Sequence, residues 1–519
     1  MQTIDFIVFA IFTLGVVFFG CSFYRKGGSA EDFAHAGRSL PGWVVGMSIF
    51  ATYVSSISYI GYPGKAFATN WNAFVFSLSI PVAAFFAARY FVPFYRRSGS
   101  ISAYSFLEEK FGRWARLYAS ACYLLTQIAR MGSILYLLAM PMHILMGWDM
   151  VAVIIATSVC VIVYSMLGGL KAVIWADAIQ GIILIGGALL CLGILLFSMP
   201  EGPLQTFQIA VDPASATLGS VAHYDADATL GSVAHYGNKF SLGSFSIDSL
   251  PLRGEDGGGF WLCLIYGIFI NLQNYGIDQN YVQRYHTAKS LRDARFSVLF
   301  GGYLFIPVSA LFFLIGTALY SYYAAGVAPL PSDIAEHPDY VFPYFIVSSL
   351  PVGLRGLLIA SIFAAGMSTV STSVTSAATV IVTDYIQPLV RKKTEKPASL
   401  TTLRICSVTM GVLGMFTAIA MLGVKSIVDA WWILSGIFSG GMLGLFLLGI
   451  MPRRVSHGAA LAGCLAGIVV IAWISLAATL NLPGPHLHEY LAIVMGTTTI
   501  FVTGFLATTL FSHPSTNFQ

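Results

Sequence analysis

The amino-acid sequence predicts an all-α protein that crosses a membrane many times. Of its 519 residues, 57% are hydrophobic and only 10% are charged, whereas soluble domains are about 25% charged. The mean hydropathy is +0.77. Thirteen apolar stretches reach or approach the roughly 20 residues that a helix needs to cross a bilayer. We therefore expect thirteen transmembrane helices in a single domain covering residues 1–519.

The first predicted span begins almost at the N-terminus. The segment MQTIDFIVFAIF lacks the basic region of a cleaved signal peptide, so we expect it to be retained as a membrane helix. The predicted spans are 3–23, 44–68, 73–95, 116–145, 150–167, 172–198, 260–280, 294–323, 345–383, 402–422, 429–450, 457–479 and 487–511.

Basic residues gather in every second loop between these spans. Because cytoplasmic loops carry an excess of lysine and arginine, this alternation predicts an N-terminus outside the cell and a C-terminus in the cytoplasm. The basic residues assigned to loops after odd-numbered spans are Arg25, Lys26, Arg38, Arg96, Arg97, Lys110, Arg113, Arg116, Lys171, Arg284, Lys289, Arg292, Arg295, Arg391, Lys392, Lys393, Lys396, Arg453 and Arg454.

Residues 199–259 are expected to form one long extracytoplasmic loop. The sequence ATLGSVAHY occurs in it twice, at 216–224 and 228–236. Two copies of nine residues are too few and too short for a repeat fold, so we interpret them as a local duplication. Its histidines, His223 and His235, are expected to be bystanders. The seven cysteines show neither metal-ligand spacing nor a disulfide framework.

The segment 49–67, IFATYVSSISYIGYPGKAF, begins as a membrane helix and then loses helical character. Serine, glycine and proline crowd its second half, at Ser55, Ser56, Ser58, Gly61, Pro63 and Gly64. In hydrocarbon, a freed backbone carbonyl costs several kcal/mol unless another group satisfies it. We therefore predict a helix break that a bound cation or polar solute completes. A kinked span packed by small residues is the alternative.

A second interruption is predicted in INLQNYGIDQNYVQRY, where Gln273, Asn274 and Gly276 lie within an apolar span. It comes five spans after the first. Paired irregular segments at corresponding positions of two halves are typical of inverted-repeat transporters.

Charged and hydroxyl side chains inside the spans indicate a binding site. A charge near the bilayer centre costs at least about 2.5–3.5 kcal/mol, so Asp177 and Arg130 each need a partner. Ser368, Thr369, Ser371 and Thr372 share one helical face, and Ser373 follows. Hydroxyls, backbone carbonyls and a carboxylate suit a hard cation such as sodium. The alternatives are back-bonding Ser/Thr packing, a buried pair of Asp177 with a basic neighbour, and a structural role for Arg130.

The sequence resembles the sodium:solute symporters, which share the fold of the bacterial leucine transporter. The resemblance covers nearly the whole chain and rests on PGWVVGMSIFATYVSSIS, GGLKAVIWADAIQG, DQNYVQRY and IASIFAAGMSTVSTSVTS. Within the family, the chain is most similar to bacterial sialic acid symporters. This resemblance implies an inverted-repeat core in spans 2–11, a bacterial inner-membrane location, and sodium ions as coupling ions.

The resemblance also implies residue roles. One sodium site would use the carbonyls of Ala51, Val54 and Ala365 with the hydroxyls of Ser368 and Thr369. A second would use Asp177, Ser371 and Thr372, with Ser368 as a further candidate. Arg130 would hold a substrate carboxylate, because a guanidinium matches that group. The other residues assigned to substrate are Ser55, Ser58, Tyr53, Ser77, Gln273 and Asn274.

Three positions depart from the sialic acid symporters: Ser77 replaces a glutamine, Tyr53 a threonine and Ala73 a phenylalanine. From the resemblance we predict sodium-coupled import of a sialic acid or related carboxylated sugar. Because of the three departures, a neutral sugar or a monocarboxylate is the alternative substrate. A receptor or channel on the same fold is a further alternative. An enzyme is not expected, because no nucleophile–base pair or metal cluster is evident. The predicted partners are the solute, sodium and the bilayer, without nucleic acid, and the protein is expected to be a monomer.

Overall fold

The computed structural model describes residues 3–22, 36–212, 238–246, 259–391, 399–424, 427–451, 455–476 and 487–511. Within these ranges the chain is helical, and its only strand-like pairing is an isolated parallel bridge between Leu40 and Ala288. The duplicated segments, including His223 and His235, lie outside the described residues.

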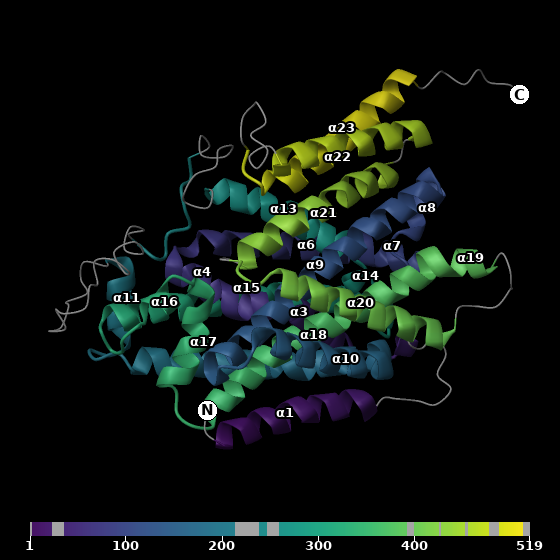
Figure 1. The fold of residues 1–519 in the computed structure, drawn as a ribbon. Helices are drawn as coiled ribbons and strands as arrows, with labels where there is room; N and C mark the ends of the chain where they lie inside the picture. The colour runs from purple at the N-terminus through teal and green to yellow at the C-terminus, as the bar shows by residue number, and fades with distance from the viewer. Residues whose placement is uncertain are drawn as a thin grey trace, which may run out of the picture.

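Helices that run alongside one another form the body of the molecule (Figure 1). They are α1 (Thr3–Ser22), α3 (Gly42–Tyr53), α4 (Tyr62–Ala68), α6 (Ile80–Phe86), α7 (Val92–Ser98), α9 (Arg113–Met146), α10 (Met150–Phe197), α13 (Phe260–Ile277), α14 (Gln279–Thr287), α15 (Leu291–Ala324), α18 (Leu354–Val380), α20 (Leu400–Ala420), α21 (Ile427–Ile450), α22 (His457–Leu476) and α23 (Leu491–Phe511). Shorter elements join or extend them: η1 (Ala36–Arg38), η2 (Ile57–Gly61), η3 (Trp71–Phe74), α5 (Val75–Leu78), η4 (Ala87–Phe91), α8 (Ser105–Phe111), α11 (Pro203–Val211), α16 (Ser332–Ala335), α17 (Pro338–Ser349), η8 (Ile381–Ile386) and α19 (Gln387–Arg391).

In the part of the chain that the structure describes, the helices that could cross a membrane are fewer than the thirteen predicted spans. Among the described residues, eleven helices are long and apolar enough to cross a membrane, or twelve with the bent pair Gly42–Tyr53 and Ile57–Ala68. The stretch predicted at 150–167 contributes a shorter apolar helix, Met150–Val163. It continues into the next predicted span through a kink at Gly169, whose φ of 62° suits glycine. Thirteen spans therefore remain a prediction.

The bounds of one predicted span are wrong, and part of the predicted loop 199–259 is helical. The segment 345–383 was expected to be one span, but α17 and α18 are separate helices because the chain leaves helical geometry between Ser349 and Leu354. The predicted loop 199–259 contains α11, and its buried Lys239 donates to the carbonyls of Phe67 and Thr69 at 2.8 and 2.9 Å. These contacts satisfy carbonyls at the end of α4 that its last turn leaves unpaired.

Both predicted helix breaks are present. Between α3 and η2 the chain bends by 58°, and Val54 has extended backbone angles (φ −79°, ψ 104°). Between α13 and α14, Asp278 is extended and its side chain accepts a hydrogen bond from the Asn280 N–H, which caps α14. This break lies two residues beyond Gly276, because the capping aspartate rather than the glycine ends the first helix.

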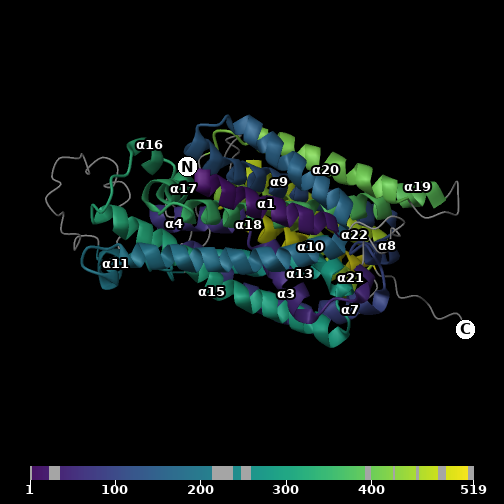
Figure 2. The same cartoon turned by 90° about the horizontal axis from the view of Figure 1, so that it is seen from below.

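α18 occupies the centre of the bundle. In the most apolar 18-residue stretch of Leu354–Leu389, 94% of the residues are buried, against 18% in Thr3–Gly20 of the peripheral α1. Figures 1 and 2 place α8 and α19 at one end of the bundle and α11 and α16 at the other. α8, which carries Lys110 in its last turn, thus lies at the end opposite α16, which carries Asp333 in its first turn; which end faces the cytoplasm stays a prediction.

Candidate functional site

The end of α3 meets the middle of α18 at a cluster of oxygen atoms. The Ser368 hydroxyl lies 3.2 Å from the Ala51 carbonyl oxygen and 3.1 Å from that of Ala365. The Thr369 hydroxyl lies 3.2 Å from the same Ala365 oxygen. All four residues are buried. The structure therefore brings together four of the five residues assigned to the first sodium ion, and the fifth, Val54, ends α3 beside them.

The helix break explains why these carbonyls are available. An uninterrupted helix would bond each carbonyl to the N–H four residues on, but beyond Val54 the chain leaves helical geometry. The Ala51 carbonyl instead accepts from Ser368, and the Thr52 carbonyl accepts from Arg130 Nη2 at 2.6 Å. The orphaned carbonyls of α3 are thus satisfied by side chains from α18 and α9.

The hydroxyl row of α18 also shows the back-bonding alternative. The Ser371 hydroxyl donates to the Ser368 carbonyl at 2.9 Å, and that of Thr375 donates to the Ser371 carbonyl at 2.8 Å. A hydroxyl that donates its single proton in this way keeps its lone pairs. Back-bonding orients these oxygens and is compatible with cation binding.

Asp177, assigned to the second sodium ion, has a basic neighbour. Its Oδ2 lies 2.8 Å from Arg284 Nη2 and accepts from the Ser48 hydroxyl at 2.6 Å. The same Nη2 donates to the Thr372 hydroxyl at 2.7 Å. Asp177 and Thr372 therefore lie close together, but both contact the guanidinium of Arg284. Arg284 is fully buried, so its assignment to a loop was wrong: the chain places it one turn inside α14, facing the bundle.

A cavity lies next to the oxygen cluster, between the two breaks. It encloses about 590 Å³ of non-atom space, part of which is open solvent. Its walls come from both broken spans and from α5, α9 and α21. The lining residues are Tyr53, Ser55, Ile57, Ser58, Tyr62, Phe76, Thr126, Gln127, Arg130, Tyr266, Ile270, Asn274, Asp278, Tyr281, Trp431, Trp432 and Ser435.

Five of the seven residues assigned to the substrate line this cavity: Arg130, Ser55, Ser58, Tyr53 and Asn274. The Tyr53 hydroxyl donates to the Asn271 side chain, and its ring lies 4.7 Å from that of Phe305. Ser77 and Gln273 lie outside the lining. Ser77 is fully buried and its hydroxyl is 2.7 Å from that of Ser309 on α15. Gln273 is buried on α13 with no hydrogen-bond partner for its amide among the described residues.

Sequence reasoning missed the carboxylate in the cavity wall. Asp278 is buried, accepts from the Asn280 N–H at 2.7 Å, and lies 3.4 Å from Gln127 Nε2. An aspartate directly before a helix is a capping signal. The aspartate of the DQNY segment is Asp278, so this signal could have located it. Nothing in the sequence indicates the α21 wall, because Trp431 and Trp432 are about 300 residues from Arg130. Trp431 lies with its ring centroid 5.9 Å from the Arg130 guanidinium carbon.

The chain is similar to known proteins over nearly its whole length. Residues 33–467 match the family model of the sodium:solute symporter family. The chain is 29% identical to the sodium/sialic acid symporter NanT of Aliivibrio fischeri, over 98% of this chain and 94% of that one. It is likewise 29% identical to SiaT of Proteus mirabilis, over 98% and 95%. The mouse sodium-coupled monocarboxylate transporter 2 is 28% identical, over 96% of this chain and 77% of its own length.

Solved structures show the same fold. A Na⁺-coupled sialic acid symporter in a substrate-bound, outward-open state superposes with a TM-score of 0.83 at 27% identity, covering 98% of both chains. Mhp1, a nucleobase-cation-symport-1 family transporter, gives a TM-score of 0.52 at 16% identity, over 92% of this chain and 96% of that one. The prediction of an all-α fold with a leucine-transporter-like core is confirmed.

Proposed function

The chain belongs to the sodium:solute symporter family, and from that premise we propose that it imports a sialic acid or related carboxylated sugar together with sodium. Sodium ions are the coupling ions of this family, and the bundle described above is a multi-pass membrane protein. We further propose that it acts as a monomer in a bacterial inner membrane, with the N-terminus outside and the C-terminus in the cytoplasm, and that it catalyses no covalent reaction.

One observation carries the coupling: the solute cavity and the first sodium site share the end of α3. The Thr52 carbonyl accepts from Arg130 in the cavity wall, and the neighbouring Ala51 carbonyl lies among the sodium-site oxygens. Sodium that fixes Ala51 and Val54 also fixes the next residues of the break, which line the cavity. Each ligand therefore raises the affinity for the other, as reciprocal coupling requires.

The cavity supports an acidic, polyhydroxylated solute. Arg130 presents a guanidinium with five N–H donors, one of which reaches Thr52. Serine, asparagine and glutamine side chains offer hydrogen bonds to sugar hydroxyls, and Trp431 and Tyr281 offer aromatic faces. Two sodium ions with one carboxylate would move one net positive charge, which adds about 2.3 kcal/mol of driving force per 100 mV.

Equilibrium binding tests the substrate assignment. Purified protein in sodium buffer is titrated calorimetrically with sialic acid, a neutral hexose and a short monocarboxylate, for wild type, Arg130→Lys and Arg130→Ala. We expect sialic acid to bind wild type, with at least about tenfold weaker binding to Arg130→Ala and intermediate binding to Arg130→Lys, because lysine keeps the charge without the planar fork. Binding of the hexose alone, unaffected by either substitution, would contradict the carboxylate assignment.

A monocarboxylate is the second candidate substrate. Sodium-coupled monocarboxylate transporters are among the chain's relatives, and the same arginine would hold any carboxylate. Tyr53 and Trp431 make part of the cavity wall aromatic, which suits a small apolar acid. Tighter binding of the monocarboxylate than of sialic acid in the same titration would select this candidate.

A further inference from the structure

Arg284 lies on the oxygen atoms assigned to the second sodium ion. Its Nη2 is 2.8 Å from Asp177 Oδ2 and 2.7 Å from Thr372 Oγ1. Its Nε donates to the Ser48 hydroxyl at 2.8 Å, and its Nη1 donates to the Asn280 carbonyl at 2.7 Å. Four of the five donors of the guanidinium are therefore engaged. The side chain is 0% exposed.

These contacts tie the two half-helices to the rest of the bundle. Ser48 belongs to α3 and Arg284 to α14, whereas Asp177 and Thr372 belong to α10 and α18. The half-helices are also joined to each other, because Leu40 donates to the Thr287 carbonyl at 3.1 Å and accepts from the Lys289 N–H at 3.2 Å. The chain just before α3 and the end of α14 are thus joined, and Arg284 links both half-helices to α10 and α18.

A sodium ion and the guanidinium compete for the same partners. Two unit charges a few ångströms apart repel by several kcal/mol in a poorly screened interior, and a single carboxylate, Asp177, serves both. The Thr372 oxygen and Asp177 Oδ2 already accept from Arg284. Asp177 Oδ1 is buried with no hydrogen-bond partner among the described residues. This oxygen gives an arriving cation a first ligand before Arg284 leaves.

We propose that Arg284 is a tethered cation that occupies the second sodium site and is displaced when sodium binds there. The proposal rests on the symport function proposed above. With sodium absent, Arg284 neutralises Asp177 and holds α3 and α14 against α10 and α18. With sodium present, the ion takes Asp177 and Thr372, and the half-helices lose that attachment. Asp177 then has a cationic partner in both states, and ion occupancy sets a helix–helix contact.

Sodium-dependent thermal unfolding of the purified protein tests this exchange without any measurement of transport. Melting temperatures are recorded at increasing sodium, with choline keeping ionic strength constant, because a ligand that binds only the folded state raises the melting temperature as it saturates. The variants are wild type, Arg284→Gln, and Arg284→Gln combined with Asp177→Asn. The control is Arg116→Gln, which removes another arginine bound to a buried aspartate.

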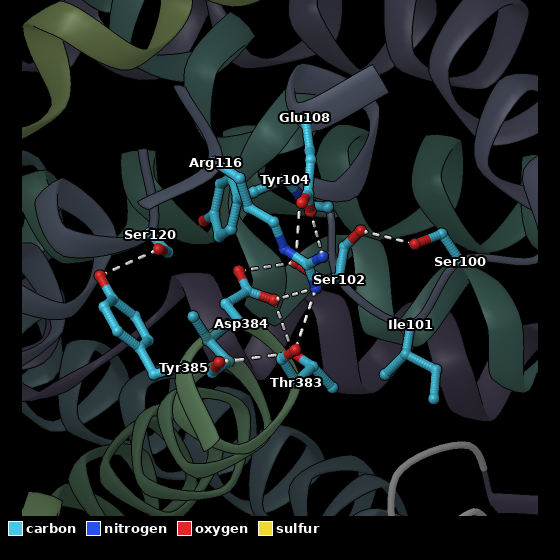
Figure 3. A network of polar contacts seen from close by, with 12 residues as sticks. Ser100, Ile101, Ser102, Tyr104, Glu108, Arg116, Ser120, Thr383, Asp384 and Tyr385 are labelled. Carbon is cyan, nitrogen blue, oxygen red and sulfur yellow. Dashed lines mark hydrogen bonds and ion pairs between the residues drawn. The ribbon is translucent and has the colours of Figure 1, made fainter. Parts of the chain in front are cut away.

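Arg116 is a matched control because its network is formed by other residues, from α8, α9 and η8, and includes none of those assigned to sodium (Figure 3). Its Nη2 is 2.7 Å from Asp384 Oδ1, and its Nη1 is 2.6 Å from Glu108 Oε2. Asp384 also accepts from the Ser102 hydroxyl at 2.9 Å. Loss of Arg116 therefore strands a buried carboxylate as loss of Arg284 does, on η8 beyond the end of α18.

We expect Arg284→Gln to melt lower than wild type in choline and to need about tenfold less sodium for half-maximal stabilisation, because the competitor is gone and Asp177 is left without its partner. The decrease in the sodium requirement should vanish in the double variant. Arg116→Gln should melt lower than wild type with an unchanged sodium requirement. An unchanged or higher sodium requirement in Arg284→Gln would overturn the proposal.

Ser48→Ala serves if Arg284→Gln does not fold. It removes one anchor of the guanidinium and one donor to Asp177 while keeping the ion pair, and we expect a smaller decrease in the sodium requirement; no decrease would overturn the proposal. Failure of the symport function itself has a different signature: sodium would stabilise none of the variants, the control included, and the proposal would fall with it.

Discussion

At the scale of single residues, the site is built from groups that the helix breaks leave without ordinary partners. The Ala51 and Thr52 carbonyls have no helical N–H to bond, and Ser368 and Arg130 reach them from other helices. Asp278 caps α14 and places a carboxylate in the cavity wall near Arg130. A basic and an acidic side chain thus line the same cavity.

The Thr369 hydroxyl is expected to contribute directly to sodium affinity. Thr369→Val keeps the shape of the side chain and removes one oxygen, and a hydrogen-bond-like contact to a charged group is worth about 1.5–3 kcal/mol. We predict that the sodium concentration for half-maximal uptake rises by about tenfold or more. Thr375→Val on the same helix is the control, since its hydroxyl donates to the Ser371 carbonyl. Equal effects of both substitutions would contradict the assignment.

At the scale of helices, the sequence predicts the apolar elements and both breaks but not their contacts. Runs of apolar residues predict where helices form. The first break falls at Val54, just before the cluster of serine, glycine and proline, and residues 57–68 of the same span are helical again. The partner of Asp177 lies 107 positions away, and local patterns carry no signal for such a contact. The same holds for Ser77, whose partner Ser309 is 232 positions away. Charge counting misplaced Arg284 because a basic residue near a predicted helix end was taken as a loop residue.

Close packing of α3 on α15 depends on glycine. A Cβ at Gly301 would lie 2.8 Å from the Gly46 carbonyl oxygen, a backbone atom that cannot move aside easily. We predict that Gly301→Ala lowers stability by about 1–3 kcal/mol, the usual cost of overpacking. At Gly186 a Cβ would meet no atom within 4 Å, so Gly186→Ala should be neutral or stabilising. Melting temperatures of Gly301→Ala and Gly186→Ala measure the two effects. A similar decrease in melting temperature in both variants would contradict the packing role of Gly301.

α17 carries a titratable contact with the start of α21 and with α4. Asp339 Oδ2 accepts from the Ile427 N–H at 3.2 Å, and its Oδ1 lies against Gly64. Burial raises the pKa of Asp339 to about 6, and the hydrogen bond from Ile427 opposes the shift only in part. Between about pH 4 and pH 6 the folded protein therefore binds more protons than the unfolded chain, so this residue's contribution to stability falls as pH rises through that window.

Asp339→Asn keeps the acceptor for Ile427 and removes the titration. We predict that the melting temperature of wild type relative to Asp339→Asn decreases as the pH is raised from about 4.5 to about 6.5, and is constant above that range. Melting curves at matched ionic strength measure this difference. A difference that is independent of pH would show that the Asp339 carboxyl does not titrate in this window.

At the scale of the whole molecule, a central helix and two interrupted spans surround one cavity. α18 is enclosed on nearly all sides and supplies the hydroxyl oxygens, whereas α1, α22 and α23 lie at the periphery (Figure 1). In the proposed assignment, sodium at the end of α3 orders the break that lines the cavity, and Arg284 links the half-helices α3 and α14 to α10 and α18. Ion binding and solute binding therefore act on the same half-helices, which is the requirement for coupled transport.

Uptake into proteoliposomes tests the central claim most directly. Labelled sialic acid is supplied outside vesicles that hold the purified protein, under an inward sodium gradient, with choline in place of sodium, or with the gradient collapsed by an ionophore. We predict accumulation above equilibrium only with the sodium gradient, and its loss in Arg130→Ala. Equal uptake with choline, or equilibration without accumulation, would contradict a sodium-coupled symporter of sialic acid.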